Sequence, residues 1–298
     1  MFYSGTHPMA GRRPAGLSLW RPGADWLTPD DSEVALAFLP SRIWLIGLGN
    51  LGQAYLWMLA TLPYRDPRDL DLVLQDYDHV AQSNDSTSVL TQQEMIGRRK
   101  TRAVAEWLDR RGFNTIIEER RFSQFTQRSP QEPAVALCGV DNSHSRAELE
   151  GAGFGLVVES GLGAGTNSFK NFSLHTFPSS LSAAKLWSKG PAAPEPHVGS
   201  MPAYDPLAHP HLDGCGLAQL ASRTVGVPFV GLTAATLVIA ELLRRLHGGL
   251  ALELISGSMS TLEDIEVSPT TSGPYAFGHC PVADPINSHS VCSTIALA

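Results

Sequence analysis

The chain has 298 residues, of which 43% are hydrophobic and 17% charged, so it is long enough to bury the core of one large or two ordinary globular domains. Its formal net charge of −7 argues against a general nucleic-acid-binding coat, which requires a basic excess. The four cysteines form no C-x-x-C motif, which argues against a disulfide framework. The N-terminus lacks the apolar core of a signal peptide, and the longest apolar run, residues 225–240, is too short for a membrane span. We therefore expect a soluble, cytoplasmic protein.

A glycine-rich loop follows the first expected strand. Residues 1–40 are rich in Gly, Pro and Arg and form an N-terminal arm, after which residues 43–46 make a short apolar run typical of a parallel strand buried on both faces. Gly47, Gly49 and Gly52 come next and lead into a helical stretch. Strand, G-x-G-x-x-G and helix is a phosphate-cradling arrangement that NAD, FAD, SAM and ATP proteins all use, and the alternative is a glycine turn without a nucleotide.

Two acids end the second expected strand, residues 71–78. Asp76 and Asp78 lie about 20–30 residues past the glycines, where a dinucleotide-binding fold holds ribose hydroxyls. The alternative is a pair of solvated acids at a strand end.

A lysine lies in the first turn of the next expected helix, residues 97–111. A cation at this end of a helix works against the helix dipole, so the position of Lys100 makes sense if the amine meets a phosphate. The alternative is a solvated basic patch that comprises Arg98, Arg99, Lys100 and Arg102.

The rest of the pattern predicts an α/β fold, Rossmann-like and doubly wound, with a largely parallel sheet, helices on both faces and further strands. These strands are expected at residues 115–122, 133–140, 155–165, 171–177 and 250–255. Asp141 and Asn142 follow one of them at its carboxyl end, where open α/β sheets bind ligands. An apolar helix is expected at 233–249.

A long proline-rich segment, residues 178–214, separates these last elements and runs into Cys215. A loop of this length in a compact domain is usually a lid, a crossover or a tether. Residues 267–298 carry a single charge, Asp284, and give no pattern from which to assign a structure.

The order of these features resembles the ThiF/MoeB/HesA-type adenylyltransferases, relatives of the ubiquitin-activating enzymes. The resemblance covers residues 40–250 and depends on ordered motifs: GLGNLG, DYDHVAQSN, GRRK, VALCGVDNSHSR and CGLAQLASRTVGVPFVGLTAATLVIAELLRRL. Asp76, Asn84 and Lys100 have the spacing of that family without a gap. The resemblance implies an N-terminal arm (1–40), an adenylation domain (41–266) with a crossover loop (178–214) and a C-terminal tail (267–298).

The resemblance also implies the chemistry, namely ATP-dependent adenylation of a carboxylate, typically at the C-terminus of a ubiquitin-like or sulfur-carrier protein. Asp141 would hold Mg²⁺, and Lys100 would neutralise phosphate charge. Cys215 would then take the acyl group as a thioester or form an acyl disulfide. Asp213 would raise the pKa of Cys215, and the alternative is a buried, inert cysteine. The nucleotide would be bound by Gly47, Gly49, Asn50, Gly52, Asp76, Asp78, Asn84, Arg99 and Lys100.

Three departures mark a divergent bacterial member. Thr87 stands where the family usually has a phosphate-contacting arginine. Candidate substitutes are Arg98, Arg99 and, from a partner subunit, Arg12, Arg13 and Arg21. The four zinc cysteines of many relatives are absent, which leaves one other possible metal set: His279, Cys280, His289 and Cys292. Residues 250–298 match nothing in the family.

Alternative functions stay open at this point. They are adenylation of a peptide or a modified tRNA base, an NAD(P)-dependent oxidoreductase, and a scaffold that has lost its chemistry. If the chain adenylates a carrier protein, its expected partners are that carrier and a conjugating enzyme. We expect it to bind neither a membrane nor nucleic acid. The apolar helix and the charge-poor second half of the chain favour a homodimer.

Overall fold

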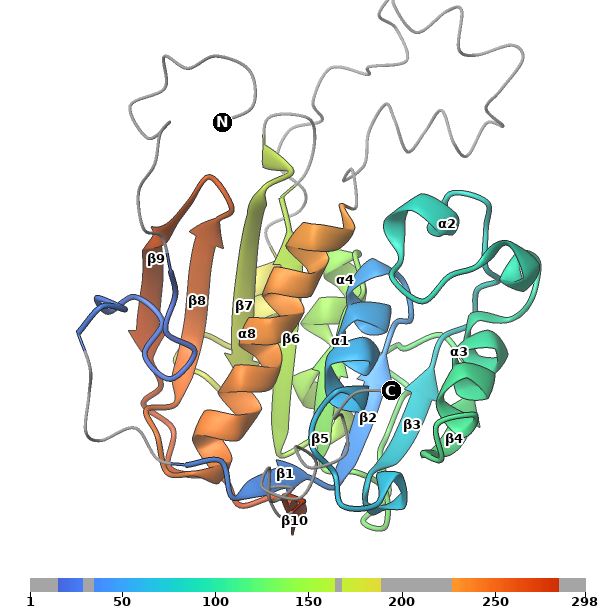
Figure 1. The fold of residues 1–298 in the computed structure, drawn as a ribbon, viewed down its shortest axis with the longest axis horizontal. Coiled ribbons are helices and arrows are strands. Elements are labelled where there is room, and N and C mark those ends of the chain that lie inside the picture. The colour runs from blue at the N-terminus through green and yellow to red at the C-terminus, as the bar shows by residue number, and fades with distance from the viewer. Residues whose placement is uncertain (1–15, 29–34, 164–167, 189–226, 284–298) are drawn as a thin grey trace, which may run out of the picture.

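A mixed eight-stranded sheet forms the centre of the computed structural model, which describes residues 16–28, 35–163, 168–188 and 227–283 (Figure 1). The strand order is β4-β3-β2-β5-β6-β7-β8-β9. The first five of these strands run parallel and the last three are antiparallel to their neighbours. In chain order the strands are β2 Arg42–Ile46, β3 Asp71–Gln75, β4 Asn114–Glu118, β5 Val135–Cys138, β6 Leu156–Leu162, β7 Asn171–Phe177, β8 Leu252–Ser258 and β9 Thr261–Pro269.

Helices cover both faces of the sheet, which confirms the expected Rossmann-like α/β fold. One face packs against α1 (Asn50–Ala60), α3 (Lys100–Asp109) and α8 (Pro228–Leu246), and α8 crosses in front of the sheet in Figure 1. The other face carries the short helices α4 (Ser143–Ala147) and α6 (Ala183–Trp187). The remaining short helices are α2 Asn84–Thr87, η1 Pro67–Asp69, η2 Gln93–Met95 and η3 Glu150–Ala152.

The main core lies between the sheet and the face formed by α1, α3 and α8. The four inner parallel strands, β2, β3, β5 and β6, contribute alternate residues to this core and to a smaller one beneath α4 and α6, whereas the edge strand β4 is half-exposed. On β6, for example, Val158 packs in the main core and Val157 in the smaller one. Burial on both faces explains why these strands appear in the sequence as continuous apolar runs.

The C-terminal part of the described chain adds strands that the sequence pattern did not reveal. β9 runs to Pro269, past the expected boundary at residue 266, and continues the sheet beside β8. β10 (His279–Pro281) then pairs with β1 (Phe38–Pro40), so residues from both ends of the described chain meet in a small second sheet. Helix α8 begins earlier than expected because Pro228 is favourable in the first turn of a helix. None of the helices in the described ranges is long and apolar enough to span a membrane.

Candidate active site

Three neighbouring parallel strands, β3, β2 and β5, end at the same edge of the sheet, and their loops are tied together there. Gly47 N–H, after β2, donates to the carbonyl of Gln75 at the end of β3 (2.9 Å). Gly139 N–H, after β5, donates to the carbonyl of Ile46 at the end of β2 (2.9 Å). The glycine loop, the two acids after β3 and Asp141 after β5 therefore belong to one edge, as expected for a ligand site in an open α/β sheet.

The glycine loop is closed so tightly that it has no room for side chains at two positions. Gly47 has φ +83°, and a Cβ at Gly52 would lie only 1.9 Å from the carbonyl oxygen of Gly47. A Cβ at Gly139 would lie 2.9 Å from the nitrogen of Gly52. Among the described residues, nothing lies within 4 Å of the Cβ position at Gly49, so this glycine faces open space. The loop thus packs backbone against backbone and exposes its tip, which is the shape needed to cradle a phosphate.

Asp76 anchors this loop. Its Oδ2 accepts a hydrogen bond from the backbone N–H of Leu48 (2.7 Å), and its Oδ1 accepts one from Asp78 N–H (2.8 Å). The Asp76 side chain is only 7% exposed. In this structure the carboxylate therefore fixes both the glycine loop and the turn after β3.

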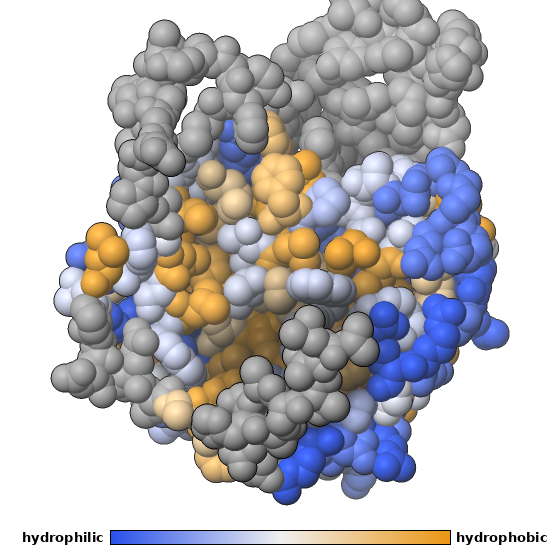
Figure 2. Space-filling model, viewed as in Figure 1, coloured by the Kyte–Doolittle hydropathy of each residue, from blue (hydrophilic) through white to orange (hydrophobic). Residues whose placement is uncertain are grey.

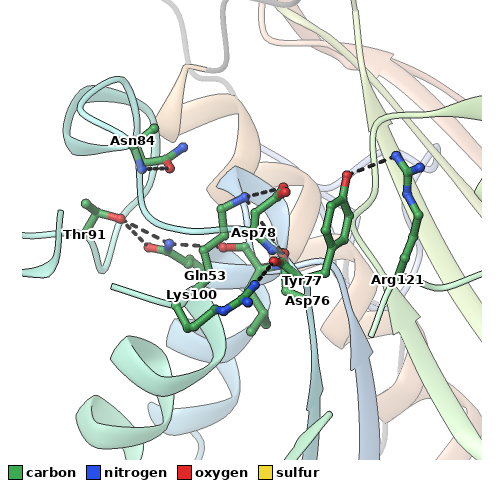
Figure 3. A network of polar contacts seen from close by, with 11 residues as sticks. Gln53, Asp76, Tyr77, Asp78, Asn84, Thr91, Lys100 and Arg121 are labelled. Atoms are coloured by element: carbon green, nitrogen blue, oxygen red, sulfur yellow. Dashed lines mark hydrogen bonds and ion pairs between the residues drawn. The ribbon is translucent and has the colours of Figure 1, made fainter. Parts of the chain in front are cut away.

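Lys100 is the first residue of α3, which begins three residues later than the expected helix over 97–111, and its amine faces both acids. Nζ lies 3.1 Å from Oδ2 of Asp78 and 3.9 Å from Oδ2 of Asp76, and the lysine side chain is 12% exposed (Figure 3). The backbone N–H of Lys100 also donates to the carbonyl of Asp78 (3.0 Å). The amine is thus held at the sheet edge, next to the acid that anchors the glycine loop.

Arg99 stabilises the same turn: its guanidinium donates a hydrogen bond to the backbone carbonyl of Tyr77, the residue between the two acids. The Tyr77 ring points away from Lys100 and towards Arg121, whose guanidinium donates to the phenol oxygen (3.0 Å) and stacks on the ring (Figure 3). Arg98 turns outward to Glu106, at 2.5 Å. The structure therefore engages Arg98 and Arg99 with protein groups.

Gln53 is a site residue that the sequence analysis missed. This side chain on α1 is 1% exposed, and its Nε2 donates to the carbonyl of Leu48 (3.2 Å) while its Oε1 accepts from Leu90 N–H (3.0 Å). It also exchanges hydrogen bonds with the hydroxyl of Thr91. Gln53 thus ties the glycine loop to the segment that follows α2. The sequence around Gln53 did not predict this role, because the fold alone brings its side chain next to Leu90 and Thr91.

Asn84 and Thr87 use their side chains within their own turn. Oδ1 of Asn84 accepts from Ala81 N–H (2.9 Å), and the Thr87 hydroxyl donates to the carbonyl of Ser83 (2.9 Å). In Figure 3, Asn84 lies apart from the pair formed by Lys100 and Asp78. Of the arginines expected from a partner subunit, Arg21 donates to the carbonyl of Thr28 (2.8 Å) in its own segment, whereas Arg12 and Arg13 lie outside the described residues.

Asn50 points into the protein. Its side chain lies against α8, where a Cβ at Gly231 would come within 2.0 Å of Oδ1. Both polar atoms of the Asn50 amide are buried and make no hydrogen bond within the part of the chain that the structure describes. A buried amide without partners at the first turn of α1 fits a site that a polar group completes on binding.

Asp141 is exposed at the start of the turn between β5 and α4. It lies two residues after Gly139, hence within about 8 Å of it along the chain. The next residue, Asn142, caps α4 by accepting a hydrogen bond from Ser145 N–H on its Oδ1 (2.7 Å). Asp141 therefore lies in a short turn between Gly139, which packs against Gly52 of the glycine loop, and the capping residue Asn142.

Two of the four cysteines are described: Cys138 is buried and Cys280, in β10, is half-buried. Cys138, at the end of β5, is fully buried, which raises its pKa to about 12, so it is not a nucleophile. Cys215, His289 and Cys292 lie outside the described residues, as does most of the expected crossover loop. In the ranges that are described, no three His, Cys, Asp or Glu side chains cluster as a metal site.

The comparisons agree with this architecture. Residues 39–249 match the model of the family described as the BilD C-terminal domain. The chain is 59% identical over 277 residues to the "Bacterial E1-like protein BilD" of Collimonas sp. (strain OK412), an alignment that covers 93% of this chain and 60% of that protein. The chain thus spans 60% of the length of this relative.

Among solved structures, E. coli MccB with succinimide has a TM-score of 0.51 at 12% identity, over 78% of this chain and 65% of that one. MccB with AMPCPP and MccA also has a TM-score of 0.51 at 12% identity, over 78% and 64% of the two chains. These likenesses show a shared fold. The name of the 59% identical relative supports the coarser part of the expectation, an E1-like protein, and not specifically ThiF, MoeB or HesA. The chain belongs to the BilD C-terminal domain family.

Proposed function

We propose that this chain catalyses ATP-dependent adenylation of the C-terminal carboxylate of a ubiquitin-like or sulfur-carrier protein. In this reaction a carboxylate oxygen attacks the α-phosphorus of ATP, the bond from that phosphorus to the β-phosphate oxygen breaks, and pyrophosphate leaves with the bonding electrons. The products are an acyl-adenylate and pyrophosphate. Such a substitution needs positioning and charge neutralisation more than covalent help from the protein.

The observation that carries the proposal is the convergence of three elements on one glycine loop. Asp76 holds the loop through Leu48 N–H and faces the Lys100 amine. On the other side, Gly139 packs against Gly52 and leads directly to Asp141. A phosphate cradle, a cation and a metal-binding type of acid therefore lie around the same turn.

The described residues offer the kinds of group that ATP and Mg²⁺ need: backbone N–H groups and an amine for the phosphates, and carboxylates for the ribose and the metal. The open tip at Gly49 and the N–H groups at the start of α1 would receive the phosphates, and Lys100 would neutralise their charge. Asp76 and Asp78 would serve the ribose side, with Asn50, Asn84 and Arg99 in support. Asp141 would hold Mg²⁺, which supplies charge neutralisation on the phosphate oxygens.

The nature of the substrate is supported by the named relatives. The 59% identical relative is named an E1-like protein, and MccB, which shares the fold, was crystallised with AMPCPP and MccA. A carrier protein would then pass its acyl group to Cys215, whose thiolate sulfur attacks the acyl carbon as AMP leaves. A conjugating enzyme would be the next acceptor.

A homodimer through α8 is part of the proposal. In Figure 2, apolar residues gather over α8 and the neighbouring strands, whereas the side formed by α3 is hydrophilic. Phe229 at the start of α8 is 50% exposed, and Trp57 on α1 is 37% exposed. An apolar surface of this kind is typical of subunit contacts.

The test is ATP–pyrophosphate exchange in the presence of a candidate carrier. We expect exchange that requires the carrier's C-terminus, a loss of about 100-fold for Lys100→Ala, and no measurable exchange for Asp141→Ala. Arg102→Ala, which removes an exposed cation on the same helix, is the matched control and should retain activity. Exchange that persists in Asp141→Ala would show that the metal role is wrongly assigned.

A second measurement separates the thioester step. Cys215→Ala should keep the exchange reaction but lose a carrier adduct that thiols cleave. If the wild-type protein neither binds ATP nor exchanges pyrophosphate, yet still captures its partner, a non-catalytic scaffold replaces the proposed function.

A further inference from the structure

A buried ionic cluster lies beneath the turn that presents Asp141, on the face of the sheet that carries α4 and α6. Glu159 on β6 is fully buried, and two residues face its carboxylate. Nε of Arg146, on α4, lies 3.3 Å from Oε2, and Nδ1 of His175, on β7, lies 2.7 Å from Oε1. Glu159 and His175 are direct partners across the two strands, so both point to the same face.

Arg146 connects this cluster with the site. Its Nε donates to the carbonyl of Val140 (2.9 Å), the residue immediately before Asp141, and its Nη2 donates to the carbonyl of Ser160 on β6 (2.7 Å). The guanidinium thus bridges the turn after β5 and the neighbouring strand. Its slot is narrow, because a Cβ at Gly161 would lie 2.8 Å from Nη1.

An aromatic ring closes the other side of the guanidinium. The Trp187 ring on α6 stacks on Arg146 at 4.5 Å and meets the His175 ring edge-on at 5.5 Å. Arg146 is therefore fixed by two carbonyls, one carboxylate and one ring. Because a buried guanidinium needs its counter-charge, loss of the Glu159 carboxylate would release the clamp on Val140.

We propose that Glu159 and His175 are positioning residues: they orient Arg146, and Arg146 sets the backbone turn that holds Asp141 in place for the metal. Outer partners of this kind set the orientation of a metal ligand and typically change metal affinity by 10–100-fold when they are removed. The inference rests on the proposed function, because it assigns a purpose to the position of Asp141.

A second buried ionic cluster provides a control for a purely structural role. Glu241 on α8 pairs with Arg244 and with Arg245 (2.6 Å from its Nε), and its Oε1 accepts from Leu252 N–H (2.9 Å). Nη1 of Arg244 donates to the carbonyl of Leu19 (2.6 Å). This cluster lies at the C-terminal end of α8 and makes no bond to the glycine loop or the β5–α4 turn within the described ranges.

The experiment compares Glu159→Gln with Glu241→Gln in the full chain. Hydrogen exchange of the amides in residues 139–147 is measured without nucleotide, and the Mg²⁺ concentration that half-saturates ATP–pyrophosphate exchange is measured in parallel. For Glu159→Gln we expect about tenfold faster amide exchange in that turn and at least about a tenfold rise in half-saturating Mg²⁺. Glu241→Gln should leave both the amide exchange of residues 139–147 and the half-saturating Mg²⁺ concentration unchanged, even if it lowers the melting temperature as much as Glu159→Gln does.

Two histidine variants test the relay directly. His175→Asn keeps a donor near the position of Nδ1 and should behave as the wild type, whereas His175→Ala should reproduce part of the Glu159→Gln effect. If Glu159→Gln does not fold, Arg146→Lys, which keeps the charge but loses the bridging geometry, takes its place.

The proposal is overturned if both glutamine variants change the exchange of residues 139–147 equally, or if Glu159→Gln leaves that turn and the Mg²⁺ dependence unaltered. A wild-type protein without pyrophosphate exchange would refute the proposed function instead. The amide measurement would still decide whether the cluster sets the turn.

Discussion

The strongest test of the glycine loop is the substitution Gly52→Ala. In a helix an alanine is ordinarily more favourable than a glycine by about 1 kcal/mol, so this change should stabilise α1 if nothing opposed it. Here the new Cβ would lie 1.9 Å from the carbonyl oxygen of Gly47. The opposing atom belongs to the backbone and cannot rotate away as a side chain would.

The size of the effect follows from this overlap. Cβ atoms rarely approach other heavy atoms closer than 3.0 Å, so the loop must move by about 3.0 − 1.9 = 1.1 Å. Overpacking of a tight interior costs about 1–3 kcal/mol, and a backbone obstacle places this case near 3. After the helix gain of about 1 kcal/mol is subtracted, we expect a net loss of about 2 kcal/mol in the free energy of unfolding.

The assay is urea unfolding of the variant together with ATP binding by calorimetry. Gly49→Ala is the matched control, because its Cβ meets no described atom within 4 Å and its φ of −83° lies outside the left-handed region. It should keep wild-type stability, so any loss of ATP binding in it reports a clash with the nucleotide. If Gly52→Ala were as stable as the wild type and bound ATP equally well, the tight-loop argument would be refuted.

Three further predictions concern buried groups. Tyr55→Phe removes the hydroxyl that reaches Ser160 and the Cys138 carbonyl, and should cost about 1–2 kcal/mol in urea unfolding. Burial raises the pKa of Cys138 to about 12, so between pH 9 and pH 12 the thiol ionises in the unfolded chain but stays protonated in the folded one. The free energy of unfolding of the wild type should therefore fall, relative to that of Cys138→Ala, as the pH rises from 9 towards 12. Arg244→Ala should cost about 3 kcal/mol, seen as a lower melting temperature, because Glu241 loses one of its two buried partners.

Local patterns were sufficient to predict the parallel half of the sheet and the first turn of the site. Strand β2 was expected at residues 43–46 and spans Arg42–Ile46, and Lys100 lies in the first turn of α3, although that helix begins at residue 100 and not at the expected 97. The glycine spacing predicted a tight loop, and the structure shows why glycine is needed there: Gly52 lies so close to Gly47 and to Gly139 that a larger residue has no space. These features are encoded in adjacent residues.

What escaped prediction depends on distant partners. Gln53 joins Leu48 to Leu90, and no pattern near any of them indicates the bond. Glu159 did interrupt an apolar strand, which signals a buried counter-charge, but its partner His175 is chosen by the β6–β7 register. The strands β9 and β10 were missed because β10 has only three residues and β9 is largely polar and half-exposed, with Ile265 and Val267 as its one short alternating stretch.

The charges around the glycine loop show what nucleotide binding would require. Lys100 faces the carboxylates of Asp76 and Asp78, so one positive and two negative charges meet there, and Asp141 adds another negative charge nearby. This edge would repel a triphosphate unless a divalent cation entered with it. Arg99 is engaged with a carbonyl, and position 87 carries a threonine. A divalent cation that enters with the nucleotide would supply the missing positive charge, and an arginine from another subunit is the second source that we propose.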